Sequence, residues 1–241
     1  MNLAIDVGNT NTKAALFEND RVKELWCDKS PEALEVYVGT LCRQHTIERV
    51  TAAVVGTSPH WPNVLPAELL SRLHLVSSQS QLPFRIGYRT PETLGADRLA
   101  VVAGARCHYA EDPLLVIDAG SCITIDYVDS GNVFRGGVIM PGVAMRLRAM
   151  HTLTARLPLL EVNDDAPLIG STTEECMMSG SVNASALEVE GYIGRMTDEV
   201  SNLKVLMTGG DAARLLPRLR REAELCENLL MEGLNKLGKM N

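Results

Sequence analysis

Short apolar runs and tight polar turns alternate in two similar blocks of the chain. Each block contains three apolar segments, and such segments joined by short turns are typical of antiparallel strands. Each half of the chain is therefore predicted to begin with a three-stranded meander. In the first half, the first and last apolar runs are residues 3–5 and 22–27, and the turn before the last run is residues 18–20. In the second half, the corresponding runs are residues 115–117 and 133–139, and the turn is residues 129–132.

Helical patterns follow each meander. Residues 31–44 are predicted to form a helix, because Ser30 can cap its start and Pro31 suits its first position. Ser171 and Glu174 have the spacing of a capping box, which predicts a long helix to about Asp198. The remaining pattern predicts strands over residues 50–55 and 203–207, and helices over residues 94–109, 143–150, 211–219 and 225–237.

One sequence pattern, D-x-G-x-x-x-T, occurs at residues 6–12 and again at residues 118–124, each time after an apolar triplet. A repeat of this kind indicates a duplicated unit. The fold class is therefore predicted to be α/β, with two duplicated domains over residues 1–113 and 114–241. We expect these domains to face each other with the active site in the cleft between them.

Composition narrows the possible partners. The 241 residues are 46% hydrophobic but only 4% aromatic, which predicts an aliphatic core. The net charge of −7 makes the chain a poor general binder of nucleic acid or of anionic membranes. No membrane span is predicted, and Asp6 interrupts any signal segment. We expect a cytoplasmic protein whose six cysteines are reduced.

The first repeated segment has the features of a phosphate loop. Gly8 lets the backbone approach a phosphate, Lys13 supplies a positive charge, and Asp6 suits Mg²⁺. An ordinary turn between two strands is the alternative, but the repeat favours phosphate binding. The predicted ATP-binding residues here are Asp6, Val7, Gly8, Asn9, Thr10, Asn11, Thr12 and Lys13.

The second repeated segment, residues 118–124, carries the same chemistry. Its Ser121 and Thr124 hydroxyls suit phosphate oxygens, and Asp118 suits a cation. Further along, Gly209 and Gly210 follow a predicted strand and open a helix, which would let a nucleoside lie against the backbone. Taken alone, that glycine pair is equally consistent with an ordinary turn between strand and helix.

Two further motifs are weaker by themselves. Asp97 and Arg98 lie at a predicted helix start, where an ionised carboxylate could accept a proton. The alternative is a surface pair without a role. The segment G-G-V-I-M-P-G at residues 136–142 ends a strand with a glycine-rich turn, and its alternative is a tight connection.

The two loops and the late glycine pair resemble the actin/hexokinase/Hsp70 class of ATPases, which has two duplicated actin-like (ribonuclease H-like) domains. The full set of motifs, including G-A-D-R at residues 95–98, resembles type III pantothenate kinase over nearly the whole chain. The resemblance implies ATP-dependent phosphorylation of pantothenate to 4′-phosphopantothenate, which is the first committed step of coenzyme A biosynthesis. It also implies a homodimer in which the second copy completes the pantothenate pocket.

Residue roles follow from the same resemblance. Asp97 would be the catalytic base, Asp118 would bind a monovalent cation (K⁺ or NH₄⁺), and Ser121 of the second loop would bind ATP. The first loop would hold the phosphates of ATP, with Mg²⁺ at Asp6 directly or through water. Thr172 is possible in place of Thr173 as a substrate contact. The implied pantothenate contacts are Tyr88, Gly95, Ala96, Asp97, Arg98 and Thr173.

Two features of the sequence depart from the family pattern. Cys122 replaces a residue that is commonly small or Thr, and the segment 214–221 is unusually basic and is interpreted as a solvated helix face.

Two alternative functions are also considered. One alternative is a regulator similar to Bvg accessory factors, although the acidic charge argues against direct DNA contact. The other is a phosphatase of the same superfold, since the fold alone does not fix the function.

Overall fold

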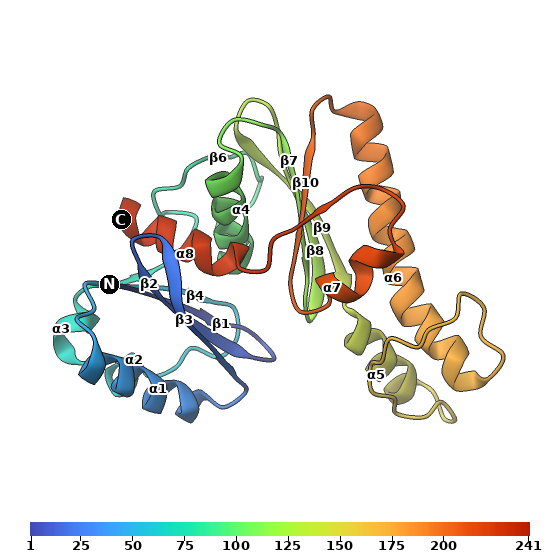
Figure 1. Cartoon of the computed structure of the whole chain (residues 1–241), viewed down its shortest axis with the longest axis horizontal. Helices are drawn as coiled ribbons and strands as arrows, with labels where there is room; N and C mark the ends of the chain where they lie inside the picture. Colours follow the sequence, from blue (N-terminus) through green and yellow to red (C-terminus); the bar gives the residue numbers. More distant parts are fainter. The chain divides into compact units, whose positions relative to one another are not determined.

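The computed structural model describes the backbone of residues 1–241 and every side chain except that of Pro31. The chain forms two compact units (Figure 1). The first unit contains Met1–Ala110 together with Asn228–Asn241, and the second contains Glu111–Glu227. Each unit has its own sheet and its own helices.

The first unit is built on a five-stranded sheet in the order β3-β2-β1-β4-β5. The meander β1–β2–β3 is antiparallel, and β4 and β5 add to β1 in parallel. Asn19 and Asp20 both have positive φ in the turn between β2 and β3, as a tight hairpin requires. The strands are β1 Asn2–Val7, β2 Thr12–Glu18, β3 Arg21–Asp28, β4 Arg49–Val54 and β5 Leu73–Leu75; the short β6 is Arg85–Ile86.

The strands of the second unit run in the order β11-β10-β7-β8-β9, which reproduces the first sheet. Here too the meander is antiparallel; β10 pairs in parallel with β7, the first strand of the meander, and β11 pairs in parallel with β10. The two predicted meanders and the duplication are thus confirmed. The strands are β7 Leu114–Ala119, β8 Cys122–Val128, β9 Val133–Pro141, β10 Lys204–Thr208 and β11 Glu224–Leu225.

Aliphatic side chains fill the core of each unit. In the first unit, Leu3, Ile5 and Leu16 pack against Val38 and Leu41 of α1. Figure 1 shows α1–α3 on one side of this sheet and α4 and α8 on the other. The helices of this unit are α1 Pro31–Gln44, α2 Trp61–Val64, α3 Ala67–Leu70, α4 Ala96–His108 and α8 Leu229–Met240, with a 3-10 turn at Pro91–Thr93.

In the second unit the core lies between the sheet and the helices α5 and α6. Ile117 and Ile125 of the sheet pack with Leu147 of α5 and with Val182 and Val189 of α6. The helices of this unit are α5 Val143–Leu153, α6 Thr173–Glu199 and α7 Ala212–Leu215, with a 3-10 turn at Leu216–Arg218.

The C-terminal segment of the chain belongs to a different unit from the one expected. The sequence-based division assigned everything after Pro113 to the second domain, but α8 belongs to the first unit. The reason is its close packing on α4: a Cβ on Gly233 would lie 1.7 Å from the carbonyl oxygen of Ala100. Only a glycine lets the two helix backbones approach so closely.

Three predicted element limits were wrong. The capping box that opens α6 is formed by Thr172 and Glu175, one residue later than predicted. The last helix begins at Leu229, because residues 224–225 form β11 instead. The helix predicted over residues 211–219 is one α-helical turn followed by a 3-10 turn, because Pro217 has no N–H to continue the α-helical pattern.

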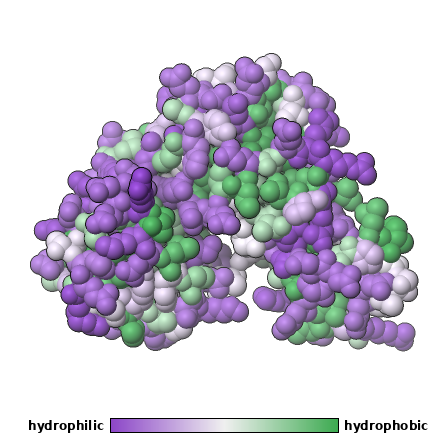
Figure 2. Space-filling view, viewed as in Figure 1, coloured by the Kyte–Doolittle hydropathy of each residue, from purple (hydrophilic) through white to green (hydrophobic). Residues whose placement is uncertain are grey.

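Apolar side chains are exposed on the loop between α5 and α6. Leu159, Leu168 and Ile169 are 64%, 67% and 85% exposed. Figure 2 shows hydrophobic residues gathered over this loop, at the right of the view. An exposed apolar patch commonly marks a contact surface. None of the described helices combines the length and the hydrophobicity that crossing a bilayer requires.

Candidate active site

The first predicted phosphate loop is a tight turn between β1 and β2. The N–H of Gly8 donates a hydrogen bond to the carbonyl oxygen of Asn11 at 3.1 Å. A Cβ on Gly8 would lie 2.8 Å from that oxygen, so the turn requires a residue without a side chain. Asn9 and Thr10 are exposed at the tip, while Thr12 is buried at the start of β2. The loop therefore presents backbone and short polar groups to solvent.

Asp6 and Lys13 face each other across β1 and β2. They are direct partners in the antiparallel register, which brings their side chains to the same face of the sheet. Asp6 is only 7% exposed. A carboxylate with a lysine opposite it, at the base of a tight loop, provides the oxygen ligand that Mg²⁺ prefers and a positive charge for a phosphate. The residues present thus fit a magnesium–phosphate group.

Sequence reasoning missed Gly56, which supports this loop from behind. The N–H of Gly56 donates to the carbonyl oxygen of Val7 at 2.9 Å. A Cβ on Gly56 would lie 2.3 Å from the carbonyl oxygen of Gly8. Gly56 follows β4, the strand that pairs with β1 in parallel, so both strands end at the same edge. The pattern V-V-G gave no signal in the sequence, because its contact depends on the pairing of β1 with β4.

Asp97 lies in the first turn of α4, whose N-terminus begins beside the same edge. Its Oδ1 accepts a hydrogen bond from the N–H of Arg98 at 2.8 Å. No other hydrogen bond to the Asp97 carboxylate occurs among the described residues, so Oδ2 is available to a substrate. A Cβ on Gly95 would lie 2.4 Å from Asp97 Oδ1 and 3.9 Å from Val55, the residue before Gly56. The candidate base and the first loop thus share the end of β4.

The structure also brings Tyr88 and Arg98 together. The guanidinium carbon of Arg98 lies 5.8 Å from the centre of the Tyr88 ring, a cation–π distance. Arg98 is only 6% exposed, and Ala96 beside it is also buried. Gly95, Ala96, Asp97, Arg98 and Tyr88 therefore form one group around the start of α4. A buried guanidinium beside an aromatic ring suits a carboxylate-bearing substrate.

The second predicted loop joins β7 to β8 in the same way. The N–H of Gly120 donates to the carbonyl oxygen of Cys122 at 3.0 Å. Ser121 is exposed at the tip, and Asp118 and Thr124 are partners in the register below it. Gly142 closes the loop from the side, because its N–H donates to the carbonyl oxygen of Ser121 at 3.1 Å.

The late glycine pair packs directly on this second loop. The N–H of Asp211 donates to the carbonyl oxygen of Ala119 at 2.8 Å. Gly209 has a φ of +97°, and a Cβ there would lie 2.4 Å from Asp118 Oδ1 and 2.5 Å from the carbonyl oxygen of Ala119. Two oxygen atoms thus converge on the space that a side chain would fill. Gly209 therefore lies directly beside Asp118, and Gly210 follows it in the chain.

Asp211 and Arg214 form an ion pair behind the glycine pair. Burial raises the pKa of Asp211, although the adjacent Arg214 opposes this shift. Arg214 also binds Asp164 at 2.7 Å, and Arg218 donates to the carbonyl oxygen of Asp164 at 2.9 Å. The interpretation of segment 214–221 as a solvated face was therefore wrong for these two arginines. Both bind Asp164, so they connect the loop between α5 and α6 to α7 and to the 3-10 turn that follows it.

Thr173 is the first residue of α6 and is exposed. Thr172 caps the helix, since its Oγ1 accepts a hydrogen bond from the N–H of Glu175 at 3.2 Å. The cap uses an acceptor position of Thr172, whereas Thr173 makes no side-chain hydrogen bond among the described residues. Within the second unit, no described hydrogen bond joins either threonine to the loop at residues 118–124.

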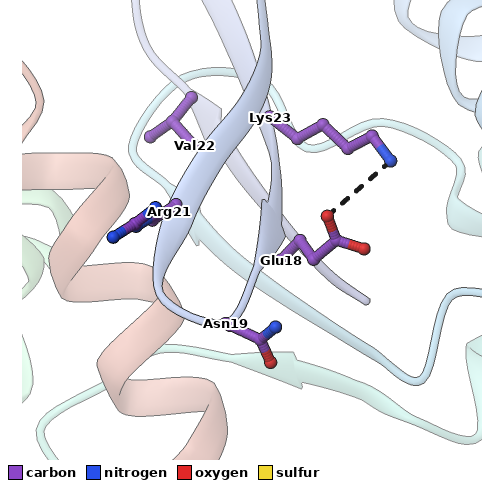
Figure 3. Close-up of a pocket in the computed structure, with 5 residues that line it drawn as sticks. All are labelled: Glu18, Asn19, Arg21, Val22 and Lys23. Atoms are coloured by element: carbon purple, nitrogen blue, oxygen red, sulfur yellow. Dashed lines mark ion pairs between the residues drawn. The ribbon is translucent and has the colours of Figure 1, made fainter.

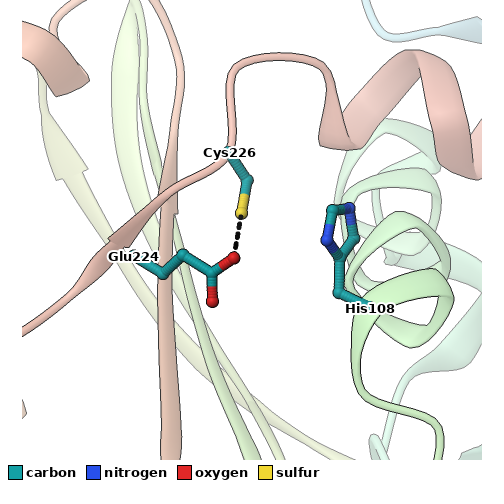
Figure 4. A group of neighbouring side chains, drawn as sticks. All are labelled: His108, Glu224 and Cys226. Carbon is teal, nitrogen blue, oxygen red and sulfur yellow. Dashed lines mark hydrogen bonds between the residues drawn. The ribbon is translucent and has the colours of Figure 1, made fainter.

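Two other features lie apart from these groups. An open depression of about 440 Å³ lies at the turn between β2 and β3 (Figure 3), which is the opposite end of β2 from the first loop. In the second unit, Cys226 donates a hydrogen bond to Glu224 at 3.6 Å (Figure 4). No disulfide forms among the described cysteines. The residues that line the depression are Glu18, Asn19, Arg21, Val22 and Lys23.

Solved structures with a similar fold share little sequence identity with this chain. A protein described as a Baf family transcriptional activator from Campylobacter jejuni aligns with a TM-score of 0.61 and 21% identity, over 98% of this chain and 97% of that one. A ROK family glucokinase from Streptomyces griseus, in complex with glucose and AMPPNP, gives 0.51 and 11%, over 99% and 98%. These similarities show the fold, which is the two-domain actin-like fold.

Sequence comparison is more specific. The family model for type III pantothenate kinase matches residues 2–195. The type III pantothenate kinase of Flavobacterium psychrophilum is 37% identical over 240 residues, which cover 98% of each chain. That of Bacteroides fragilis strain ATCC 25285 is 36% identical over 247 residues, covering 100% of this chain and 98% of the relative. The chain therefore belongs to the type III pantothenate kinase family and phosphorylates pantothenate with ATP for coenzyme A biosynthesis.

Proposed function

We propose that Asp97 is the general base of the reaction. The observation that carries this proposal is the position of Asp97 beside Val55, which directly follows β4. The next residue, Gly56, contacts the first phosphate loop, so Asp97 and that loop lie at the same strand end. The primary hydroxyl of pantothenate is a weak nucleophile, and its attack on the γ-phosphate requires the loss of its proton. Asp97 Oδ2 accepts this proton while Oδ1 stays bound to the helix start.

Substrate binding is assigned to the group around α4. Arg98 and Tyr88 hold the carboxylate end of pantothenate, because they place a guanidinium and an aromatic ring side by side at low exposure. Gly95 and Ala96 let the substrate approach the backbone. Thr173 is the further substrate contact, since its hydroxyl is exposed and is not part of the helix cap.

ATP binding is assigned to the two repeated loops and the glycine pair. The backbone of residues 6–13 and Ser121 hold the phosphates, and Gly209 and Gly210 hold the nucleoside. Lys13 stabilises the negative charge that develops on the transferred phosphoryl group. Asp6 holds Mg²⁺ directly or through water, and the ion neutralises phosphate charge when bound.

A monovalent cation site is assigned to Asp118. The support is the convergence of Asp118 Oδ1 and the carbonyl oxygen of Ala119 at Gly209. Oxygen ligands of this kind suit a weakly hydrated hard cation, for which we propose K⁺ or NH₄⁺. The cation would offset the negative charge that Asp118 brings to the phosphate-binding loop.

The active enzyme is proposed to be a homodimer in which the second copy completes the pantothenate pocket. The support is the exposed apolar surface of Leu159, Leu168 and Ile169, which lies on the loop that leads into Thr173. An apolar surface of this kind next to a substrate contact suits an interface between two copies of the chain.

The experiment is an ADP-release assay with ATP and Mg²⁺, with and without pantothenate, in K⁺ or in Na⁺. We expect ADP release to require pantothenate and to be faster in K⁺. The Asp118→Ala variant is expected to lower the apparent affinity of the enzyme for K⁺ by about 10- to 100-fold, the usual cost of altering a metal site. Asp165→Ala, which removes an exposed acid from the same unit, is the control. An Asp118→Ala enzyme with normal K⁺ activation would contradict the cation assignment.

A further inference from the structure

Arg146, on the first turn of α5, connects three parts of the second unit. Its Nε donates to the carbonyl oxygen of Pro141 at 2.9 Å. Its two terminal nitrogens bind the two carboxylate oxygens of Glu188 on α6, at 3.0 and 2.5 Å. Arg146 is 17% exposed, so this bidentate pair is largely shielded from water on the arginine side. A planar guanidinium makes all three bonds at once, which a lysine cannot do.

The carbonyl that Arg146 holds is next to the second phosphate loop. Pro141 is the register partner of Cys122 in the pairing of β9 with β8. Gly142, the following residue, donates its N–H to the carbonyl oxygen of Ser121. A Cβ on Gly142 would lie 2.2 Å from the carbonyl oxygen of Gly120 and 2.6 Å from that of Ser121. The corner between β9 and α5 is thus in direct contact with two residues of the loop.

We propose that Arg146, held by Glu188, is a positioning residue for ATP binding at the second phosphate loop. Glu188 binds Arg146, and Arg146 binds the carbonyl oxygen of Pro141. The next residue, Gly142, contacts the backbone carbonyl groups of Gly120 and Ser121. Arg146 fixes the corner that sets the backbone at Ser121, and it touches neither substrate. This inference rests on the proposed role of Ser121 in ATP binding.

A merely structural ion pair would join α5 to α6 without favouring one substrate. The two roles therefore differ in which substrate loses affinity. If Arg146 positions the loop, its loss raises the KM for ATP and reduces the thermal stabilisation that ATP gives the protein. If it only joins two helices, the unliganded protein loses stability and both KM values change together or not at all.

The test compares Arg146→Lys and Glu188→Gln with the unaltered enzyme. We expect Arg146→Lys to raise the KM for ATP by about 2- to 10-fold, the equivalent of one lost hydrogen bond, while the KM for pantothenate stays within about twofold. Glu188→Gln, which leaves the bond to Pro141 in place, is expected to have a smaller effect in the same direction. The ATP-induced rise in melting temperature should shrink in the same order.

Arg135→Lys is the matched control. Arg135 lies on β9, the strand whose last residue, Pro141, is held by Arg146. Arg135 also pairs with a carboxylate, that of Asp129, but it is 55% exposed and lies near the opposite end of β9. Its KM for ATP should not change. Should Arg146→Lys fail to fold, Glu188→Gln carries the test alone, and an unchanged KM for ATP in that variant overturns the inference.

A Ser121→Ala variant separates failure of this inference from failure of the proposed function. If Ser121→Ala binds ATP normally, the assignment of the loop itself is wrong. If Ser121→Ala weakens ATP binding but Arg146→Lys changes neither the KM for ATP nor the ATP-induced stabilisation, then the loop binds ATP without help from Arg146. A rise of equal size in both KM values would also overturn the positioning role.

Discussion

Four glycines shape the two predicted phosphate loops because oxygen atoms occupy the space that a side chain would need. Gly8, Gly56, Gly142 and Gly209 each place a backbone or carboxylate oxygen within 2.2–2.8 Å of where a Cβ would lie. Gly209 in addition has a positive φ, which other residues adopt only at a cost of about 1 kcal/mol. These positions let the two loops pack against the neighbouring strand ends and turn their polar groups outward.

The proposed role of Asp97 as the general base can be tested with a single substitution. Changing Asp97 to Asn keeps its shape and its hydrogen bond to the N–H of Arg98 but removes the ability to accept a proton. We expect kcat to fall by about 10²–10⁴-fold, the usual contribution of a positioned base. ATP binding and the melting temperature should stay the same. Steady-state kinetics and thermal unfolding measure these quantities.

Glu92→Gln is the control for this change, because Glu92 is an exposed carboxylate five residues away that makes no described side-chain contact. It should leave kcat unchanged. A loss in Asp97→Asn that is confined to KM would make Asp97 a binding residue and not the base. A large drop in melting temperature would instead make its role structural.

Single residues also show what the sequence could and could not predict of the site. The two loops could be predicted because each is a continuous segment, so Gly8, Ser121 and their neighbours carry the signal locally. Gly56 could not, because its contact with Gly8 arises only when β4 pairs with β1. The capping box was placed one residue early because Ser171, Thr172 and Thr173 can all cap a helix, and the sequence does not show that the extended backbone of the cap falls at Thr172.

At the scale of elements, the helix that carries Asp97 is held by the C-terminal helix. Ten of the thirteen residues of α4 are buried, and α8 packs along it through Gly104 and Gly233. His108 at the end of α4 binds Glu232 of α8 at 2.7 Å. The sequence predicted both helices but not their pairing, because α4 and α8 are separated by the whole second unit. Pairing between distant segments leaves no local pattern.

Gly233→Ala tests this contact. The added methyl group would meet the carbonyl oxygen of Ala100 at 1.7 Å and the amide nitrogen of Gly104 at 2.8 Å, both of them backbone atoms that cannot rotate away. Alanine is the better helix former, but overpacking of this kind costs about 1–3 kcal/mol. We expect the melting temperature to fall by about 2–12 °C.

Gly191→Ala is the matched control for that substitution. Gly191 also lies inside a helix, α6, and its added methyl group would meet no atom within 4 Å. Here helix propensity acts alone, so the variant should be as stable as the unaltered protein or up to about 1 kcal/mol more stable. If Gly233→Ala and Gly191→Ala behave alike in thermal unfolding, the α4–α8 contact is not as close as described.

For the whole molecule, the duplication explains why so much of the architecture could be predicted. The five strands β1–β5 and the five strands β7–β11 are arranged in the same order, and each set carries its loop between its first two strands. The repeat D-x-G-x-x-x-T therefore locates two equivalent positions in two equivalent sheets. In both units a glycine after the next parallel strand, Gly56 in one and Gly209 in the other, packs on that loop. The second unit differs by its long α6 and by the exposed apolar loop before it.

That apolar loop leads to the last prediction, which concerns assembly. Ile169 is 85% exposed, so its replacement by Asp should not disturb the fold of a single chain. In a two-fold symmetric dimer the new charge would be buried twice, once from each copy. We expect Ile169→Asp to weaken dimerisation by about 100-fold or more and to raise the KM for pantothenate, with the KM for ATP unchanged.

Light scattering coupled to size-exclusion chromatography, run over a range of protein concentrations, measures the first effect, and steady-state kinetics measures the second. The control is Val36→Asp, which places the same charge at a 69% exposed apolar position on α1 of the first unit. If Ile169→Asp stays dimeric, the interface lies elsewhere. If it becomes monomeric but keeps its KM for pantothenate, each chain binds the substrate by itself. A monomer with weakened pantothenate binding and normal ATP binding is the result that requires a pocket shared between two copies, because only the pantothenate site would then depend on the second chain.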